Sequence, residues 1–169
     1  MKILETERLL LRTMAPEDAP FYLELVNDPA WLRYIGDRGV RTLEEARAAI
    51  VRGPVAMQER VGFSLYLTEL KAGAVPIGIC GLIKRDGLDD VDIGFAFLPQ
   101  FCGQGYAFEA AAAVMAHAQR VIGLKRVVAI TAPGNQSSIR LLEKLGLRFE
   151  RMVRLTESSA ESRLFVLDF

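Results

Sequence analysis

Histidine and cysteine are scarce in this chain. Its 169 residues include one histidine, His117, and two cysteines, Cys80 and Cys102. The two cysteines lack the spacing of a metal-ligand pair, and a single imidazole adds little, so we expect no bound metal. Two isolated cysteines are more typical of reduced cytosolic thiols than of a disulfide scaffold.

Neither sign of charge is in excess, and long apolar runs are missing. The 21 basic residues balance the 21 acidic ones, which gives no electrostatic reason to expect nucleic acid or a membrane surface as a partner. The most apolar helical stretch, 107–118, contains Glu109 and is too short to span a bilayer. Charges interrupt the first twelve residues too early for a signal peptide. We therefore expect a cytoplasmic protein.

The length and composition are those of one soluble globular domain. Hydrophobic residues make up 51% of the chain and charged residues 25%. No repeat, low-complexity tract or polar linker divides the sequence, and the length suits a single well-buried core. We expect one domain that covers residues 1–169.

Hydrophobic periodicity and turn residues predict the element order β-α-α-β-β-β-α-β-α-β-β. Strands are expected at 6–14, 62–70, 75–85, 89–99, 126–132, 147–155 and 163–169. Helices are expected to begin at Pro16, at the capping box of Thr42 and Glu45, near residue 104 and at Asn135, whereas 28–41 is expected to be a loop. The fold class is α+β (α/β in looser usage), a mixed but mainly antiparallel sheet with helices packed on it.

Two glycines, Gly103 and Gly105, stand two residues apart where the strand 89–99 leads into the helix near 104. They could be turn residues without further function. A nucleoside triphosphate loop would need a Lys-Ser/Thr pair after the last glycine, and that pair is absent. A dinucleotide fingerprint would need a small residue at the position of Phe108. Free amides at a helix N-terminus remain, and these favour a pyrophosphate without any lysine.

The motif Gln100-x-x-Gly103-x-Gly105 resembles the acyl-CoA motif of the GNAT acetyltransferases. The segments 92–99 (DIGFAFLP), 135–147 (NQSSIRLLEKLGL), 5–12 (ETERLLLR) and 105–110 (GYAFEA) are similar to the RimJ/RimL-like (ribosomal-protein N-acetyltransferase-like) branch of that superfamily. The similarity runs through the whole chain in the right order. It implies a GNAT-like single domain whose sheet is splayed between the fourth and fifth predicted strands.

The resemblance also implies how acetyl-CoA, the expected cosubstrate, would bind. The backbone amides from Gly103 to Ala107 would hold the pyrophosphate, a bulge near Phe97 and Leu98 would open the sheet for pantetheine, and an amide near Leu98 would polarise the thioester carbonyl. The expected cofactor-binding residues are Phe97, Leu98, Gln100, Gly103, Gln104, Gly105, Tyr106, Ala107 and Asn135.

The catalytic acid and base depart from the common pattern. Many GNAT enzymes carry a tyrosine seven residues after the asparagine as thiol donor, and here that position is Leu142. In the RimJ/RimL-like branch a serine three residues after the asparagine often takes the role, which points to Ser138; it could equally be an ordinary first-turn helix residue. Asp92 stands where many relatives carry a glutamate base, but it could instead be a solvated hairpin carboxylate, with water relaying the proton.

The function that the resemblance implies is an acetyl-CoA-dependent N-acetyltransferase that moves an acetyl group to a primary amine. The acceptor would be a small-molecule amine or a protein N-terminal amine, and the enzyme a monomer or homodimer. Two alternatives have the same fold: a catalytically silent acyl-CoA-binding module, and an interaction protein that binds no cofactor.

Overall fold

The computed structural model describes all residues from Met1 to Phe169. Eight strands form one sheet in the order β1-β2-β3-β4-β5-β6-β8-β7. The strands are β1 (Lys2–Glu5), β2 (Leu9–Thr13), β3 (Leu65–Leu70), β4 (Val75–Ile83), β5 (Asp92–Phe97), β6 (Arg126–Thr131), β7 (Arg148–Val153) and β8 (Ser162–Asp168). Every neighbouring pair is antiparallel except β5 and β6, so the predicted mixed, mainly antiparallel sheet is confirmed.

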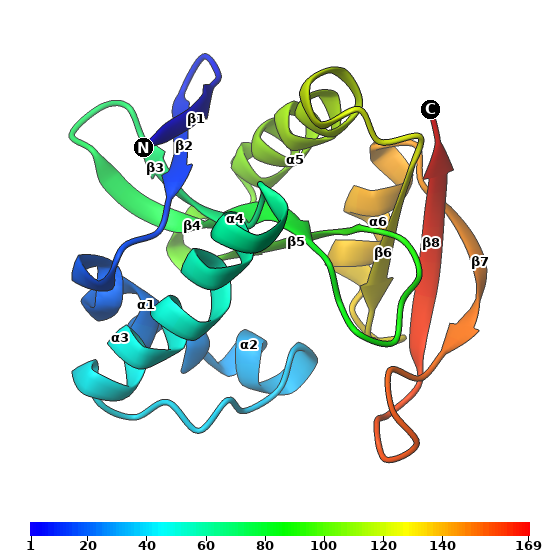
Figure 1. Ribbon diagram of the computed structural model, residues 1–169, viewed down its shortest axis with the longest axis horizontal. Helices are drawn as coiled ribbons and strands as arrows, with labels where there is room; N and C mark the ends of the chain where they lie inside the picture. Colours follow the sequence, from blue (N-terminus) through cyan, green and yellow to red (C-terminus); the bar gives the residue numbers. More distant parts are fainter.

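The helices cover both faces of this sheet (Figure 1). They are α1 (Ala19–Val26), α2 (Pro29–Tyr34), α3 (Leu43–Ile50), α4 (Ala56–Val61), α5 (Tyr106–His117) and α6 (Gln136–Lys144), with short helical turns η1 (Pro16–Asp18), η2 (Val51–Val55), η3 (Pro99–Phe101) and η4 (Ala118–Ile122). One buried cluster joins α1, α2 and α3 to the sheet, and another joins α5 and α6 to the opposite face. No helix is long and apolar enough to cross a membrane.

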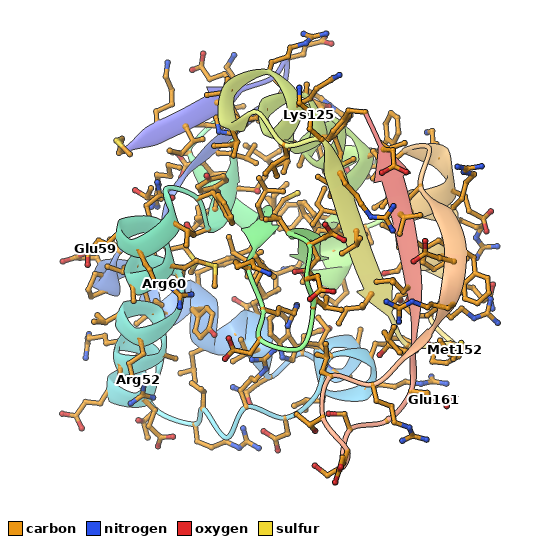
Figure 2. The ribbon with its side chains drawn as sticks, turned by 45° about the vertical axis from the view of Figure 1, so that its right-hand side comes forward. Arg52, Glu59, Arg60, Lys125, Met152 and Glu161 are labelled. Carbon is orange, nitrogen blue, oxygen red and sulfur yellow. The ribbon has the colours of Figure 1, made fainter.

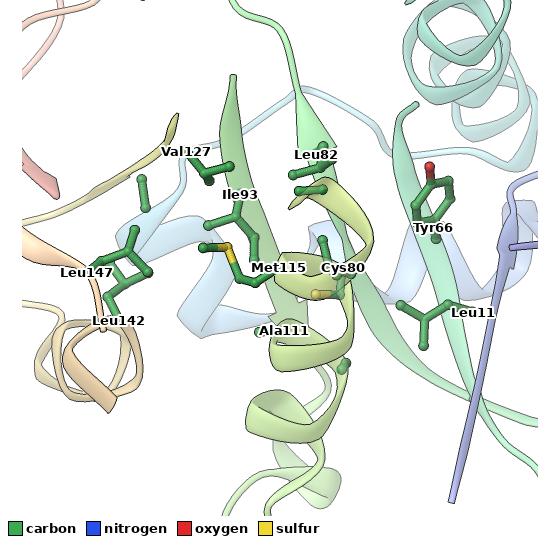
Figure 3. Close-up of a cluster of buried hydrophobic side chains, with 14 of the residues drawn as sticks. Leu11, Tyr66, Cys80, Leu82, Ile93, Ala111, Met115, Val127, Leu142 and Leu147 are labelled. Atoms are coloured by element: carbon green, nitrogen blue, oxygen red, sulfur yellow. The ribbon is translucent and has the colours of Figure 1, made fainter. Parts of the chain in front are cut away.

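Helix α5 packs on the sheet through one face, most of whose buried side chains are small. Ala110, Ala111, Val114 and Met115 repeat at helical spacing and pack in the cluster that Figure 3 shows. Leu142 of α6 is buried in the same cluster. Truncating a buried leucine to alanine typically destabilises a protein by about 2–5 kcal/mol. Leu142 stands at the position where many relatives carry a tyrosine, and in this chain that position belongs to the hydrophobic core.

The sheet is splayed where β5 meets β6. Strand β5 pairs with β4 at six consecutive positions, but with β6 only at Asp92 and Val128. Figure 1 shows β6, β8 and β7 standing apart from the strands on the other side of β5. The predicted divergence is confirmed, and the parallel β5–β6 pair is what makes the sheet mixed.

The prediction of a bulge near Phe97 and Leu98 was wrong. The register between β4 and β5 is regular throughout, and the Leu98 N–H continues it by donating to the Ile77 carbonyl at 2.9 Å. The strand then ends because Pro99 has no N–H and begins η3. The divergence therefore arises from the direction of β6 and needs no extra residue in β5.

Two local expectations also needed correction. The segment 28–41 contains α2, whose start is fixed by Asp28 as N-cap, accepting from the Ala30 N–H at 3.0 Å, and by Pro29 at the first helical position. The predicted strand 6–14 is shorter, and a separate strand β1 precedes it, with a turn closed by the Thr6 N–H bonding the Leu9 carbonyl at 2.9 Å.

Candidate functional site

The glycine loop between β5 and α5 needs its glycines for backbone reasons. Gly103 has φ +79° and Gly105 φ +83°, a left-handed conformation that other residues adopt only with strain. Gly105 is the N-cap of α5, so the first-turn amides from Tyr106 onward have no intrahelical partner. A helix N-terminus of this kind attracts anions.

Arg8 fixes the loop from the neighbouring β1–β2 turn. Its Nε donates to Glu109 Oε2 at 2.7 Å, its Nη1 donates to the Gln104 carbonyl at 3.1 Å, and its guanidinium lies 4.3 Å from the Tyr106 ring centre. Thr6 Oγ1 also donates to Glu109 Oε1, at 2.6 Å. Burial alone would raise the pKa of Glu109, but the bonds from Thr6 and Arg8 outweigh it and lower that pKa. Sequence reasoning did not find this role of Arg8, because its partners lie about a hundred positions away.

A cavity of about 1020 Å³ brings the loop, the splay and the start of α6 together. Most of the predicted site residues line it: Asp92, Phe97, Gly103, Gly105, Tyr106, Ala107, Asn135 and Ser138. The other three predicted residues, Leu98, Gln100 and Gln104, do not line it. Leu98 is buried in the core of the opposite face, and the Gln104 side chain closes the loop by donating to the Gln100 carbonyl at 3.1 Å.

The open edge of β5 presents unpaired backbone to this cavity. Because the Leu98 N–H points to β4, alternation along the strand turns the Phe97 and Phe95 amides to the other edge. Strand β6 pairs with β5 only at Asp92, so it supplies no partner for these two amides. The amide near Leu98 that faces the cleft is therefore that of Phe97, while the amide of Leu98 itself belongs to the sheet.

Asp92 is buried rather than solvated, which overturns the hairpin interpretation. Its side chain is 1% exposed and lines the cavity; Oδ2 accepts from Arg85 Nε at 3.0 Å, and Oδ1 has no hydrogen-bond partner. Burial raises the pKa of Asp92 from 3.8 to about 6, although Arg85 opposes the rise. A carboxylate with a free oxygen and a pKa near neutrality is suited to accept a proton.

The start of α6 faces the cavity from the other side of the splay. Asn135 is the N-cap, and its Oδ1 accepts from the Ser138 N–H at 3.4 Å. The Ser138 hydroxyl makes no hydrogen bond, is half-buried and lines the cavity. The capping contact thus belongs to the asparagine side chain and the serine backbone, which leaves the hydroxyl free to donate.

The profile of the acetyltransferase (GNAT) domain matches residues 8–148. The chain belongs to the GNAT acetyltransferase family. It is 30% identical over 154 residues to the Bacillus subtilis protein YkkB, covering 89% of this chain and 88% of that protein, and 28% identical over 154 residues to the B. subtilis uncharacterized N-acetyltransferase YoaA, covering 90% and 86%. This GNAT enzyme is an N-acetyltransferase.

Solved structures of GNAT acetyltransferases share its fold. The ribosomal L7/L12 alpha-N-protein acetyltransferase RimL, in complex with coenzyme A, superposes with a TM-score of 0.85 at 20% identity, covering 100% of this chain and 98% of RimL. A Bacillus anthracis acetyltransferase of the GNAT family gives 0.80 at 26% identity, covering 99% and 98%. The predicted fold is that of these enzymes.

Proposed function

We propose that this enzyme transfers the acetyl group of acetyl-CoA to a primary amine, which attacks the thioester directly. The observation that carries the proposal is the juxtaposition, in one cavity, of the amides at the start of α5 with the unpaired edge of β5. Acetyl-CoA supplies an activated acyl group. The acceptor is a small-molecule amine or a protein N-terminal amine; the structural similarity to RimL, an alpha-N-protein acetyltransferase, supports the second.

The glycine loop fits a pyrophosphate. No atom lies within 4 Å of a Cβ built on Gly103, so the loop is open to a ligand there, and a Cβ on Gly105 would lie 3.4 Å from Arg8 Nη2. The residues that would hold the phosphates are Gly103, Gln104, Gly105, Tyr106 and Ala107, through their amides. Gln100 would keep its place in the loop, since its carbonyl accepts from the Gln104 side chain.

The open edge of β5 fits the pantetheine arm as an added strand. The Phe95 and Phe97 amides are the donors on this edge, and Asn135 faces them from α6. We assign the Phe97 amide to the thioester carbonyl, with Leu98 holding the strand in place from the paired edge. A fixed amide aimed at an oxygen that gains negative charge is among the strongest sources of catalysis.

Asp92 is the proposed general base. Its unpartnered Oδ1 is the atom that would take the amine proton, directly or through a water molecule. The pKa of about 6 keeps the group ionised at neutral pH while leaving it more basic than an exposed carboxylate. Arg85 compensates its charge inside the fold.

Ser138 is the proposed proton donor to the departing thiolate. Its hydroxyl is free of other bonds and lines the cavity from α6. The alternative donor of many relatives, a tyrosine seven residues after the asparagine, is excluded by the buried Leu142.

One experiment tests the proposed reaction. The enzyme is incubated with acetyl-CoA and a panel of amines that includes amino acids, polyamines and N-terminal peptides, and release of CoA thiol is followed. The proposal expects release that depends on an amine and on Asp92. Stabilisation by acetyl-CoA without release on any amine would leave the silent binding module as the function; no stabilisation at all would leave the interaction protein.

A further inference from the structure

Part of the cavity is lined by residues of the segment that contains α1–α4. Its walls include Tyr22 of α1, Trp31 of α2 and the exposed Arg38 that follows α2. Apolar side chains complete it, among them Met14 and Leu25. None of these residues has a role in binding acetyl-CoA or in the proton transfers described above.

Trp31 carries a hydrogen-bond donor without an acceptor. The residue is 7% exposed, and its Nε1 is buried and has no partner in the protein. Indole nitrogens can only donate, and buried ones nearly always have a partner. A donor left unmatched in the wall of a cavity indicates that a ligand atom is its acceptor.

Arg38 adds a cation beside this donor. Its guanidinium carbon lies 5.9 Å from the centre of the Trp31 ring, and the side chain makes no ion pair and no hydrogen bond. Burial raises the pKa of Tyr22 and the charge of Arg38 opposes that rise, which places the guanidinium within electrostatic reach of the Tyr22 hydroxyl. That hydroxyl also has no hydrogen-bond partner. Three polar groups that can donate thus gather around one part of the cavity.

The remaining charges nearby do not neutralise this cluster. Asp92 is paired with Arg85, and Asp28 caps α2 through the Ala30 N–H. The cavity as a whole is lined by five basic residues, Arg38, Arg52, Arg85, Arg140 and Lys144, and by two aspartates, Asp28 and Asp92. Figure 2 shows Arg52 on the helical segment that includes α3 and α4. An excess of positive charge beside two neutral donors favours an anionic group of a ligand.

We propose that this part of the cavity binds a carboxylate of the acceptor, so that the substrate is an amine that also carries a carboxylate group. The inference rests on the proposed function, because it names the class of amine that the site takes. Arg38 supplies the planar pair of donors that a carboxylate accepts, and Trp31 Nε1 supplies a third. The specificity-determining residues are Arg38, Trp31 and Tyr22.

The test uses intrinsic fluorescence, because Trp31 is the only tryptophan in the chain. The enzyme is titrated with N-acetylated glycine, serine, phenylalanine and glutamate, each as the free acid and as the α-amide. A saturable change is expected with free acids, and the uncharged amides should bind at least about tenfold more weakly. N-acetylglutamate α-amide lacks the α-carboxylate but keeps the side-chain carboxylate. Binding of this compound would point to an acidic side chain at a peptide N-terminus, whereas binding of only the free acids would point to the α-carboxylate of a free amino acid.

Arg38→Gln should weaken binding of the acids at least about tenfold and leave the uncharged amides unchanged. Arg33→Gln is the matched control: Arg33 lies on α2 with its guanidinium 5.0 Å from the Tyr34 ring centre and does not line the cavity. It should bind the acids like the parent. Equal binding of acids and uncharged amides, binding of neither, or acid binding that is unchanged in Arg38→Gln would overturn the inference.

Thermal stabilisation by acetyl-CoA, measured on the same samples, distinguishes a failure of the carboxylate site from a failure of the proposed cosubstrate. Stabilisation and amine-dependent CoA release without any preference for carboxylates would overturn this inference alone. Carboxylate binding that Arg38→Gln abolishes, in a protein that acetyl-CoA does not stabilise, would support the carboxylate site and overturn the proposed cosubstrate.

Discussion

The two edges of strand β5, which lies inside the sheet, are paired very unequally. Toward β4, six consecutive residues are paired and the ladder continues through Leu98. Toward β6, only Asp92 is paired, and the strand then faces a cavity. The same backbone therefore builds the core on one side and leaves hydrogen-bonding groups unused on the other.

This difference indicates where chemistry is placed in the fold. Backbone groups at the edge of a sheet are normally covered or otherwise protected, because an exposed edge can pair with another chain. Here the unpaired edge is enclosed between β5 and β6, with the glycine loop at one end and Asp92 at the other. Substitutions at the two ends and in the walls of this edge should therefore have separable effects.

Asp92→Asn removes the proposed base at the end of the open edge where β5 pairs with β6. We expect kcat at pH 7–8 to fall by about 10²–10⁴-fold, the usual contribution of a general base, with little change in the affinity for acetyl-CoA. In the parent enzyme the acid limb of the pH profile of kcat should have an apparent pKa of about 6, and the variant should lack that limb. A variant that keeps both its rate and its acid limb would remove Asp92 from the mechanism.

Asp92→Asn should lower kcat but raise the stability of the folded protein relative to the parent. Because the folded-state pKa of Asp92 is raised, the native state binds the proton more tightly than the unfolded chain does. Parent stability should therefore decrease as pH rises from about 4 to about 6. Denaturant unfolding of parent and Asp92→Asn across this range should show the variant gaining relative stability, by at most roughly 3 kcal/mol.

Gly105→Val changes the proposed phosphate site at the other end of the open edge. A β-branched residue at φ +83° is strained, and its Cβ would crowd Arg8. Acetyl-CoA at about a hundred times its Kd should raise the Tm of the parent by roughly 5–10 °C. The variant should show no shift at this concentration, which corresponds to a loss of affinity of at least about a hundredfold.

Gly62→Val is the control for backbone strain. Gly62 is the C-cap of α4 at φ +84°, with no atom within 4 Å of an added Cβ, and it does not line the cavity. Both glycine variants should have a lowered Tm, but Gly62→Val should keep the shift with acetyl-CoA. An unchanged shift in Gly105→Val would contradict the pyrophosphate assignment.

Ser138→Ala tests the wall of α6 that faces the open edge. If the hydroxyl protonates the thiolate, kcat should fall by about 10²-fold, toward the low end of the general-acid range because thiolate is already a tolerable leaving group. Its Tm should stay near that of the parent, since the cap is made by Asn135. Asn135→Ala should instead lose about 1 kcal/mol of stability. Turnover of Ser138→Ala within about twofold of the parent would make Ser138 an ordinary helix residue.

Arg85→Gln is expected to have the smallest effect. Arg85 lowers the pKa of Asp92 against the larger effect of burial, so its removal should raise that pKa further. The acid limb of the kcat profile should move to higher pH, by about one unit, while kcat at high pH stays close to that of the parent. An acid limb that does not move would separate Arg85 from the base.

Much of this fold could be predicted because its local signals are strong. Thr42 caps α3 as predicted, with the Glu45 N–H donating to Thr42 Oγ1 at 3.1 Å, whereas the Glu45 carboxylate accepts from the Arg41 N–H at 3.3 Å and so does not complete the capping box. Gly123 ends the helical segment after α5 in a left-handed conformation, which is the usual role of a glycine after a helix. Helix α2 was missed although Asp28 and Pro29 are a start signal, because its aromatic and charged residues lack a clear apolar stripe.

The candidate site was predictable in its motif and less so in its environment. The glycine loop is a local pattern, and its position before α5 could be derived from neighbouring residues. The burial of Asp92 depends instead on how β5, β6 and Arg85 come together in space. For the same reason the unmatched donor of Trp31 could not be predicted from the sequence.

Hydrogen exchange at the two edges of β5 tests the central claim most directly. The Phe97 amide faces the cleft, whereas the adjacent Leu98 amide is bonded to Ile77. Saturating acetyl-CoA should slow exchange at Phe97 by at least about tenfold and leave Leu98, already protected, nearly unchanged. Unchanged exchange at Phe97, in a sample whose Tm shift shows that acetyl-CoA is bound, would contradict the assignment of the open edge as the binding edge.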